Sequence, residues 1–259
     1  MDTLLVTERR AIARGGKSVF GAPLGVMMLE TRFARIPGDI GNAGTWPFPV
    51  LYRVVPGASP ERVVLHAAEG LLPAFLEAAE ELVRLGAGAI TTSCGFLSLF
   101  QREIAAHVGV PVATSSLIQI PLVQATLPAG RRVGVVTVSA ASLTPAHFRA
   151  AGAAEDTPFA GTENGDEFFR VLITGAKEDL DVALAERDVV EAGRDLVRRH
   201  PEVGAIVLEC TNMPPYAAAL AAAVERPVYD ITTLIRWLCA GLRPTVYALP
   251  ATGAVRPSP

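Results

Sequence analysis

The sequence lacks the features of a membrane protein and of a nucleic-acid-binding protein. No apolar run reaches the roughly 18 to 20 residues that a membrane-spanning helix needs, because charged residues, prolines and glycines interrupt each candidate. The sequence has no lysine- and arginine-rich run, and its formal net charge is −3. Neither a nucleic-acid partner nor an anionic membrane surface is therefore expected, and we predict a small-molecule partner.

Cysteine is scarce. The three cysteines, Cys94, Cys210 and Cys239, are an odd number, and their wide spacing fits neither a disulfide framework nor a metal site of the Cys-x-x-Cys kind. The N-terminus does not resemble a secretory signal, because it begins Met1-Asp-Thr and carries Glu8 among its first basic residues. We predict free thiols in a cytoplasmic protein without a metal site.

Apolar residues make up 50% of the 259 residues and charged residues 19%, which is the balance of a compact folded protein. Buried-strand patterns alternate with helix patterns, which is typical of an α/β protein with mainly parallel sheets. One long helix is expected from Ser59 to about Leu85, with a kink at Pro73. Strands are expected at 25–29, 50–55, 88–94, 111–114, 132–138, 204–210 and 227–229.

An internal repeat places a cysteine at the end of a predicted strand in each half of the chain. Gly88-Ala-Ile-Thr-Thr-Ser-Cys94 and Gly204-Ala-Ile-Val-Leu-Glu-Cys210 share their opening and the six-residue distance from glycine to thiol. A Pro-Val pair begins seventeen residues after each cysteine. The repeat predicts two similar sheets, and ligands of such sheets bind outside the carboxyl ends of the strands. Both cysteines are predicted to lie at such ends.

The segment from 30 to 49 is an unusually long connection for a compact α/β domain. It is rich in glycine, proline, aspartate, asparagine and arginine. Long loops of this kind are often functional, so the segment is either a lid or substrate-contacting loop, or a series of solvated turns.

A thiol between a strand and a helix lies near the positive end of the helix dipole, so its pKa is expected to fall from the free value of about 8.5. The backbone N–H of Gly95 or Thr211 at the same turn is suited to hold a ligand carboxylate. Racemising the carbon next to a carboxylate requires one group to remove a proton and another to deliver one on the opposite face. Two facing thiols meet this need. Simple packing is the competing interpretation of a buried cysteine, but the repetition at equivalent positions favours chemistry.

The segments Thr91-Thr-Ser-Cys94-Gly-Phe and Leu208-Glu-Cys210-Thr-Asn212, with the duplicated α/β pattern, resemble the aspartate/glutamate racemase superfamily. Its relatives include hydantoin racemases, maleate cis–trans isomerases and arylmalonate decarboxylases. The resemblance runs from about Gly25 to Leu242. It implies two Rossmann-like domains related by a pseudo-twofold axis, an active site in the cleft between them, two-base catalysis by the cysteines and no cofactor.

The resemblance also implies a domain division. Members of the superfamily usually return their last helix to the first domain, so residues 1–127 are expected to be joined by 231–259, while 128–230 form the second domain. Dimers are common among them, and we expect a homodimer.

Two departures from the superfamily bear on the substrate. Glutamate racemases carry a Cys-Thr-His turn in the second half, where this chain has Cys210-Thr211-Asn212, and their first strand ends in an Asp-Ser pair, near which Glu30-Thr31 stands here. Glutamate is therefore not favoured as the substrate. The decarboxylase relatives keep only the second cysteine, so Cys94 argues against that branch.

We predict a cofactor-independent racemase or epimerase of a small carboxylate, an amino acid or derivative, with Cys94 and Cys210 as catalytic acid/bases. One alternative is a maleate-type cis–trans isomerase or related carbon-acid enzyme, in which a thiolate adds covalently to the substrate. The other is a non-catalytic protein that binds a small ligand with the same fold. The residues expected to bind the substrate are Ser93, Gly95, Thr211, Asn212, Thr137, Ser139, Glu30, Thr31 and Arg32.

Overall fold

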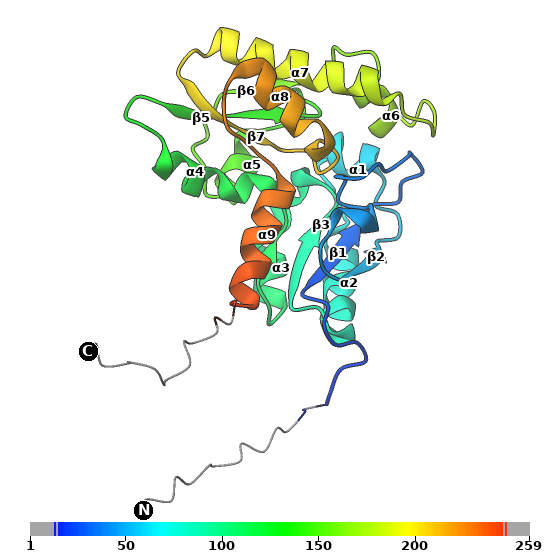
Figure 1. The fold of residues 1–259 in the computed structure, drawn as a ribbon. Helices are drawn as coiled ribbons and strands as arrows, with labels where there is room; N and C mark the ends of the chain where they lie inside the picture. The colour runs from blue at the N-terminus through cyan, green and yellow to red at the C-terminus, as the bar shows by residue number, and fades with distance from the viewer. Residues whose placement is uncertain (1–12, 14, 246, 248–259) are drawn as a thin grey trace, which may run out of the picture.

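The computed structural model describes residues 13, 15–245 and 247 and contains two four-stranded parallel sheets (Figure 1). The strand orders are β2-β1-β3-β4 and β6-β5-β7-β8, so the second sheet repeats the order of the first. The predicted α/β class with two similar sheets is confirmed. The strands are β1 (Leu24–Met28), β2 (Val50–Val54), β3 (Ala89–Thr92), β4 (Val112–Ala113), β5 (Arg132–Thr137), β6 (Phe159–Gly161), β7 (Val203–Leu208) and β8 (Val228–Tyr229).

Helices connect the strands and cover the faces of both sheets (Figure 1). Within the described residues, none is long and apolar enough to cross a membrane. The α-helices are α1 (Pro60–Val64), α2 (Leu72–Leu85), α3 (Gln101–His107), α4 (Ile120–Thr126), α5 (Pro145–Ala150), α6 (Phe168–Leu172), α7 (Val182–Arg199), α8 (Ala217–Val224) and α9 (Ile231–Leu242). The 3-10 helices are η1 (Ala43–Thr45), η2 (Gly95–Phe100), η3 (Ser116–Gln119) and η4 (Pro214–Tyr216).

The prediction of one helix from Ser59 to Leu85 is wrong. The segment forms α1 and α2, separated by a turn in which Ala67 and Ala68 adopt positive φ angles of 49° and 55°. Pro73 lies in the first turn of α2, where the backbone N–H that proline lacks would have no helical partner. The proline therefore begins a helix instead of kinking one.

The two halves share a close contact between the central strand and a long helix. A Cβ atom added to Gly25 in β1 would lie 3.1 Å from the Cβ of Leu82 in α2, and one added to Gly134 in β5 would lie 2.9 Å from Leu196 in α7. These glycines let both helices approach their sheets, and they occupy equivalent positions because they pair with Ile90 and Ile206.

The last helix packs on the first sheet although it follows the second in the chain. Ile231, Leu234 and Cys239 of α9 share one buried cluster with Leu24 and Val26 of β1. The domain ranges themselves stay a prediction, and both ends of the chain lie outside the described residues.

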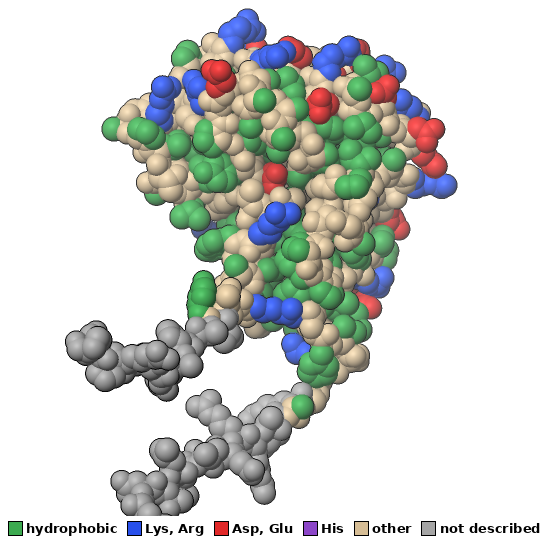
Figure 2. Space-filling model, in the orientation of Figure 1, with side chains coloured by type: hydrophobic (Ala, Val, Ile, Leu, Met, Phe, Trp, Pro, Cys, Tyr) green, Lys and Arg blue, Asp and Glu red, His purple; other side chains and the backbone are tan. Residues whose placement is uncertain are grey.

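Charges of both signs are interspersed over the outer surface beside α7 (Figure 2). Arg194 pairs there with Glu191, and Arg198 pairs with Asp195. On this face the charged side chains balance one another and form no patch of a single sign.

Candidate active site

The two repeat cysteines lie at the ends of equivalent strands and line one small cavity. Cys94 follows β3 and Cys210 follows β7, and their side chains are buried. The cavity has a volume of about 20 Å³, which is room for about one water molecule. Its wall is mostly apolar and also contains the polar side chains of Ser93, Glu209 and Asn212. The structure therefore brings both predicted catalytic residues together.

Matching backbone contacts put both turns at the carboxyl edge of their sheets. The N–H of Ser93 donates to Met27 O at 2.9 Å, and the N–H of Glu209 donates to Val136 O at 2.8 Å. A contact between the halves then joins the two turns, because the hydroxyl of Thr211 donates to Ser93 O at 2.7 Å. The second half is in this way anchored directly beside the first thiol.

The expected fall of the thiol pKa values is wrong. Burial raises the pKa of Cys94 and of Cys210 well above the ordinary value, and the nearby Glu209 carboxylate raises both further. Hydrogen bonds from the backbone N–H groups of Phe96 and Asn212 lower these two pKa values, but by less. The removal of both thiols from water therefore outweighs the effect of the helix ends.

Glu209 is the residue that sequence reasoning missed beside the second thiol. Its Oε2 accepts a hydrogen bond from the Thr137 hydroxyl at 2.8 Å, while Oε1 has no partner among the described residues. Burial raises the pKa of this carboxyl to about 7. A Cβ atom on Gly95 would lie 2.3 Å from Oε1, so a glycine is needed there. The sequence did contain a signal for Glu209, because a charged residue stands at the end of a strand that is otherwise apolar.

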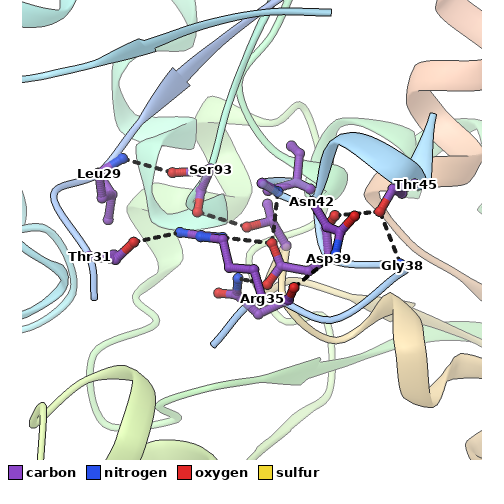
Figure 3. A network of polar contacts seen from close by, with 12 residues as sticks. Leu29, Thr31, Arg35, Gly38, Asp39, Asn42, Thr45 and Ser93 are labelled. Carbon is purple, nitrogen blue, oxygen red and sulfur yellow. Dashed lines mark hydrogen bonds and ion pairs between the residues drawn. The ribbon is translucent and has the colours of Figure 1, made fainter. Parts of the chain in front are cut away.

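A chain of polar contacts joins Thr31, Arg35 and Asp39 within the long loop (Figure 3), and it continues through Asn212 to Cys210. Arg35 Nη1 lies 2.6 Å from Asp39 Oδ1, and Asn212 Nδ2 donates to Asp39 Oδ2 at 2.5 Å. This orientation of the amide turns its Oδ1 toward Cys210, whose thiol donates to it at 3.5 Å. The chain thus favours the protonated form of the second thiol.

The loop from 30 to 49 forms part of the wall of the cavity and crosses to the second half of the molecule. The N–H of Ile40 donates to Thr211 O at 3.3 Å, and the N–H of Ala34 donates to Glu178 O at 2.9 Å. Phe33 and Arg35 line the cavity, with the guanidinium 4.8 Å from the ring centroid. The expected turns are present and Arg32 is exposed, but the interpretation of the arginines as solvated is wrong for Arg35, whose side chain is only 13% exposed.

A wider pocket of about 270 Å³ adjoins the buried cavity and shares Thr31, Phe33 and Ile173 with it. Glu30 and Arg32 line this outer pocket. Glu30 accepts the N–H of Gly57 at 2.8 Å, and Arg32 forms an exposed ion pair with Glu178. The space at the thiols is thus much smaller than the space in the outer pocket.

Of the remaining predicted binding residues, Thr137 and Ser139 do not line the cavity. Thr137 holds Glu209, and Ser139 is hydrogen-bonded to Ser142 at 3.0 Å. Ser93, which does line the cavity, accepts the N–H of Leu29 at 2.8 Å. That any of these residues contacts a substrate stays a prediction.

Two α/β halves that each place a thiol at a strand end define a two-sheet protein with one shared site, and comparisons with known proteins agree with this description. Residues 116–239 match the Asp/Glu/Hydantoin racemase family. A dimethylsulfoniopropionate lyase from Durusdinium sp. clade D is 31% identical over 217 residues, which are 81% of this chain and 71% of that protein. The chain belongs to the Asp/Glu/hydantoin racemase family of enzymes.

Further relatives and solved structures extend this picture. Dimethylsulfoniopropionate lyase 6 of Emiliania huxleyi is 32% identical over 234 residues, which are 85% of this chain but only 59% of that protein. A mutant of arylmalonate decarboxylase in its sulfate-associated form shares the fold with a TM-score of 0.57, at 14% identity over 85% of this chain and 93% of that one. Allantoin racemase from Pseudomonas fluorescens does so with a TM-score of 0.52, at 14% identity over 85% and 90%.

Proposed function

We propose that this enzyme removes a proton from the carbon next to a carboxylate, and that it does so as a lyase acting on dimethylsulfoniopropionate or a close analogue. The observation that carries the proposal is the pair of thiols, Cys94 and Cys210, in one buried cavity. The choice of a lyase is supported by the names of the similar proteins, which are dimethylsulfoniopropionate lyases.

The elimination balances without a further reagent. A thiolate takes the proton from the carbon next to the carboxylate, and the electron pair of that C–H bond forms the double bond to the next carbon. The bond from this second carbon to sulfur breaks, and its electron pair leaves with sulfur. The products are acrylate and dimethyl sulfide, and the proton passes from the thiol to water.

The two thiols have different surroundings, which supports different roles. The S–H of Cys210 donates to Asn212, so this thiol is suited to remain protonated, and it would donate to the substrate carboxylate by turning its single proton away from Asn212. Cys94 has Phe96 in the position equivalent to Asn212, and the phenyl side chain offers no oxygen to accept the S–H, although each thiol receives the backbone N–H two residues further on. We therefore assign Cys94 as the base.

A racemase or epimerase is the second candidate, because both thiols line the same cavity as two-base catalysis requires. The two candidates share the first proton transfer and differ in the second step. A racemase returns a proton to the opposite face of the same carbon, whereas a lyase expels the group on the next carbon.

The test is incubation of the full chain with dimethylsulfoniopropionate, with dimethyl sulfide measured by headspace gas chromatography and acrylate by NMR. We expect both products in equal amounts. A parallel panel of amino and hydroxy acids in D₂O reports deuterium at the carbon next to the carboxylate. Exchange in the panel without dimethyl sulfide would overturn the lyase in favour of the racemase, and neither signal would overturn both.

A further inference from the structure

Glu209 lies in the cavity with both thiols but has no part in the proton transfer proposed for them. Its side chain is fully buried and lines the cavity, and no described residue donates to its Oε1. The other oxygen, Oε2, accepts the hydroxyl of Thr137, but an ionised carboxylate that is buried without a positively charged partner is unfavourable. The position therefore calls for a positive group that the protein itself does not supply.

The charges around the cavity leave Glu209 unbalanced. Among the described lining residues, the other charged side chain is Arg35, which pairs with Asp39 at 2.6 Å and also donates to Thr31 at 2.9 Å. The positive charge of Arg35 is thus already matched within the loop. When Glu209 is ionised, the group of Arg35, Asp39 and Glu209 together carries one excess negative charge.

The remaining wall indicates what kind of cation fits. The cavity is lined by apolar side chains, including Leu29, Val138, Leu172 and Ile173. The side-chain oxygens of Thr31, Ser93 and Asn212, which also line it, already accept hydrogen bonds from the protein. A primary ammonium group carries three N–H donors and needs several acceptors. A sulfonium or quaternary ammonium group has no donor and presents methyl groups, which pack against apolar walls.

We propose that Glu209 recognises the alkylated cationic group of a zwitterionic substrate. The proposal rests on the proposed function for the carboxylate end of the substrate and narrows the substrate class to carboxylates with a fully alkylated onium group. Pairing with the cation would also offset the Glu209 charge, which raises the pKa of both thiols. Substrate binding would in this way help to form the thiolate.

The experiment compares two ligands of the same shape by isothermal titration calorimetry at pH 8. They are 3-(trimethylammonio)propanoate, which is zwitterionic, and 4,4-dimethylpentanoate, in which carbon replaces the charged nitrogen. For the wild type we expect the zwitterion to bind about tenfold or more tightly. In Glu209→Gln this preference should vanish, and in Glu209→Asp, which keeps the charge, it should return in part.

Glu163→Gln is the matched control. Glu163 also belongs to the second half, accepts a backbone N–H with one oxygen and leaves the other without a described partner, but it lies outside the cavity. We expect this variant to keep the wild-type preference.

The outcomes separate this proposal from the lyase. The titration measures binding and not turnover, so a preference that depends on Glu209 supports the cation site even if dimethylsulfoniopropionate is not cleaved. A wild type that binds neither ligand, or binds both equally, overturns it. So does a Glu209→Gln variant that keeps the preference while its circular dichroism matches the wild type.

Discussion

The turn after β3 and the turn after β7 follow the same backbone route but give their thiols different neighbours. Ser93 precedes the first thiol and accepts the N–H of Leu29, whereas Glu209 precedes the second and accepts the N–H of Val138. Two residues after each thiol, the first turn has Phe96 and the second has Asn212. The duplication thus preserves the backbone, while the side chains have diverged.

This difference indicates that the two thiols are not interchangeable. Cys210 has an acceptor for its proton, and Asn212 connects it to Asp39 and the long loop. That loop follows β1 and crosses to the second half, so the first half supplies part of the surroundings of the second thiol. Variants on each side test how far the two turns differ.

The largest effect is expected from replacing the thiols. Cys94→Ser should lower kcat by about 10²- to 10⁴-fold, the usual contribution of a positioned acid or base. If the enzyme is a lyase, kcat should decrease less in Cys210→Ser than in Cys94→Ser, because the elimination needs only one base. Equal losses would favour two-base racemisation. Cys239→Ala, a change in α9 outside the cavity, is the control and should leave kcat unchanged. A decrease of kcat below tenfold in Cys94→Ser would contradict the role of Cys94 as the base.

Removal of the loop arginine should have the next largest effect. Arg35→Ala leaves the buried carboxylate of Asp39 without its ion pair, and the free energy of unfolding should fall by about 3 to 5 kcal/mol. Arg32→Ala breaks only the exposed pair with Glu178 and should cost about 0 to 1 kcal/mol. Urea unfolding of both variants measures the contrast, and equal losses would contradict the importance of the buried pair.

The second turn has the titratable Glu209 where the first has Ser93, and this difference should make the stability of the protein depend on pH. In the folded protein this carboxyl keeps its proton up to a pKa of about 7, whereas the unfolded chain loses it near the ordinary value of 4.5. The unfolded state thus binds fewer protons in this window, and stability falls as pH rises. Relative to Glu209→Gln, the wild type should lose about 3 kcal/mol between pH 4.5 and 7. Urea unfolding at a series of pH values measures the free energy of unfolding of both proteins. If it changed with pH in the same way in both, the raised pKa of Glu209 would be contradicted.

A smaller effect is expected from Asn212→Ala. The change removes one donor from Asp39 and the acceptor for the Cys210 thiol, so stability should fall by about 1 to 2 kcal/mol. The exposed Asn164→Ala should stay within about 0.5 kcal/mol of the wild type. Thermal unfolding compares the two, and an unchanged Asn212→Ala would show that the polar chain contributes little to stability.

Much of the fold was predictable because the buried strands carry strong local signals. The β7 segment is a continuous apolar run, β3 consists of two apolar residues and two β-branched threonines, and the shared Gly-Ala-Ile opening revealed the repeat. The break between α1 and α2 was missed, because the alanines that adopt positive φ there are good helix formers and gave no local sign of a turn.

The surroundings of the thiols were less predictable, because they depend on contacts between distant segments. The sequence shows the length and composition of the long loop. It does not show that Asp39 accepts a hydrogen bond from Asn212, which lies 173 residues away in the chain. Glu209 was visible beside Cys210, yet its effect on both thiol pKa values required knowing that it is buried between the halves. Burial reversed the direction expected from the helix ends alone.

The most direct test of proton removal by the thiols is dimethyl sulfide release, in single turnover, from dimethylsulfoniopropionate that carries deuterium next to the carboxylate. We expect the wild type to release dimethyl sulfide more slowly from the deuterated than from the unlabelled substrate, and the double variant Cys94→Ser with Cys210→Ser to release almost none from either. Equal rates for the two substrates in the wild type, or release that persists in the double variant, would contradict the assignment of the thiols as the proton-transfer groups.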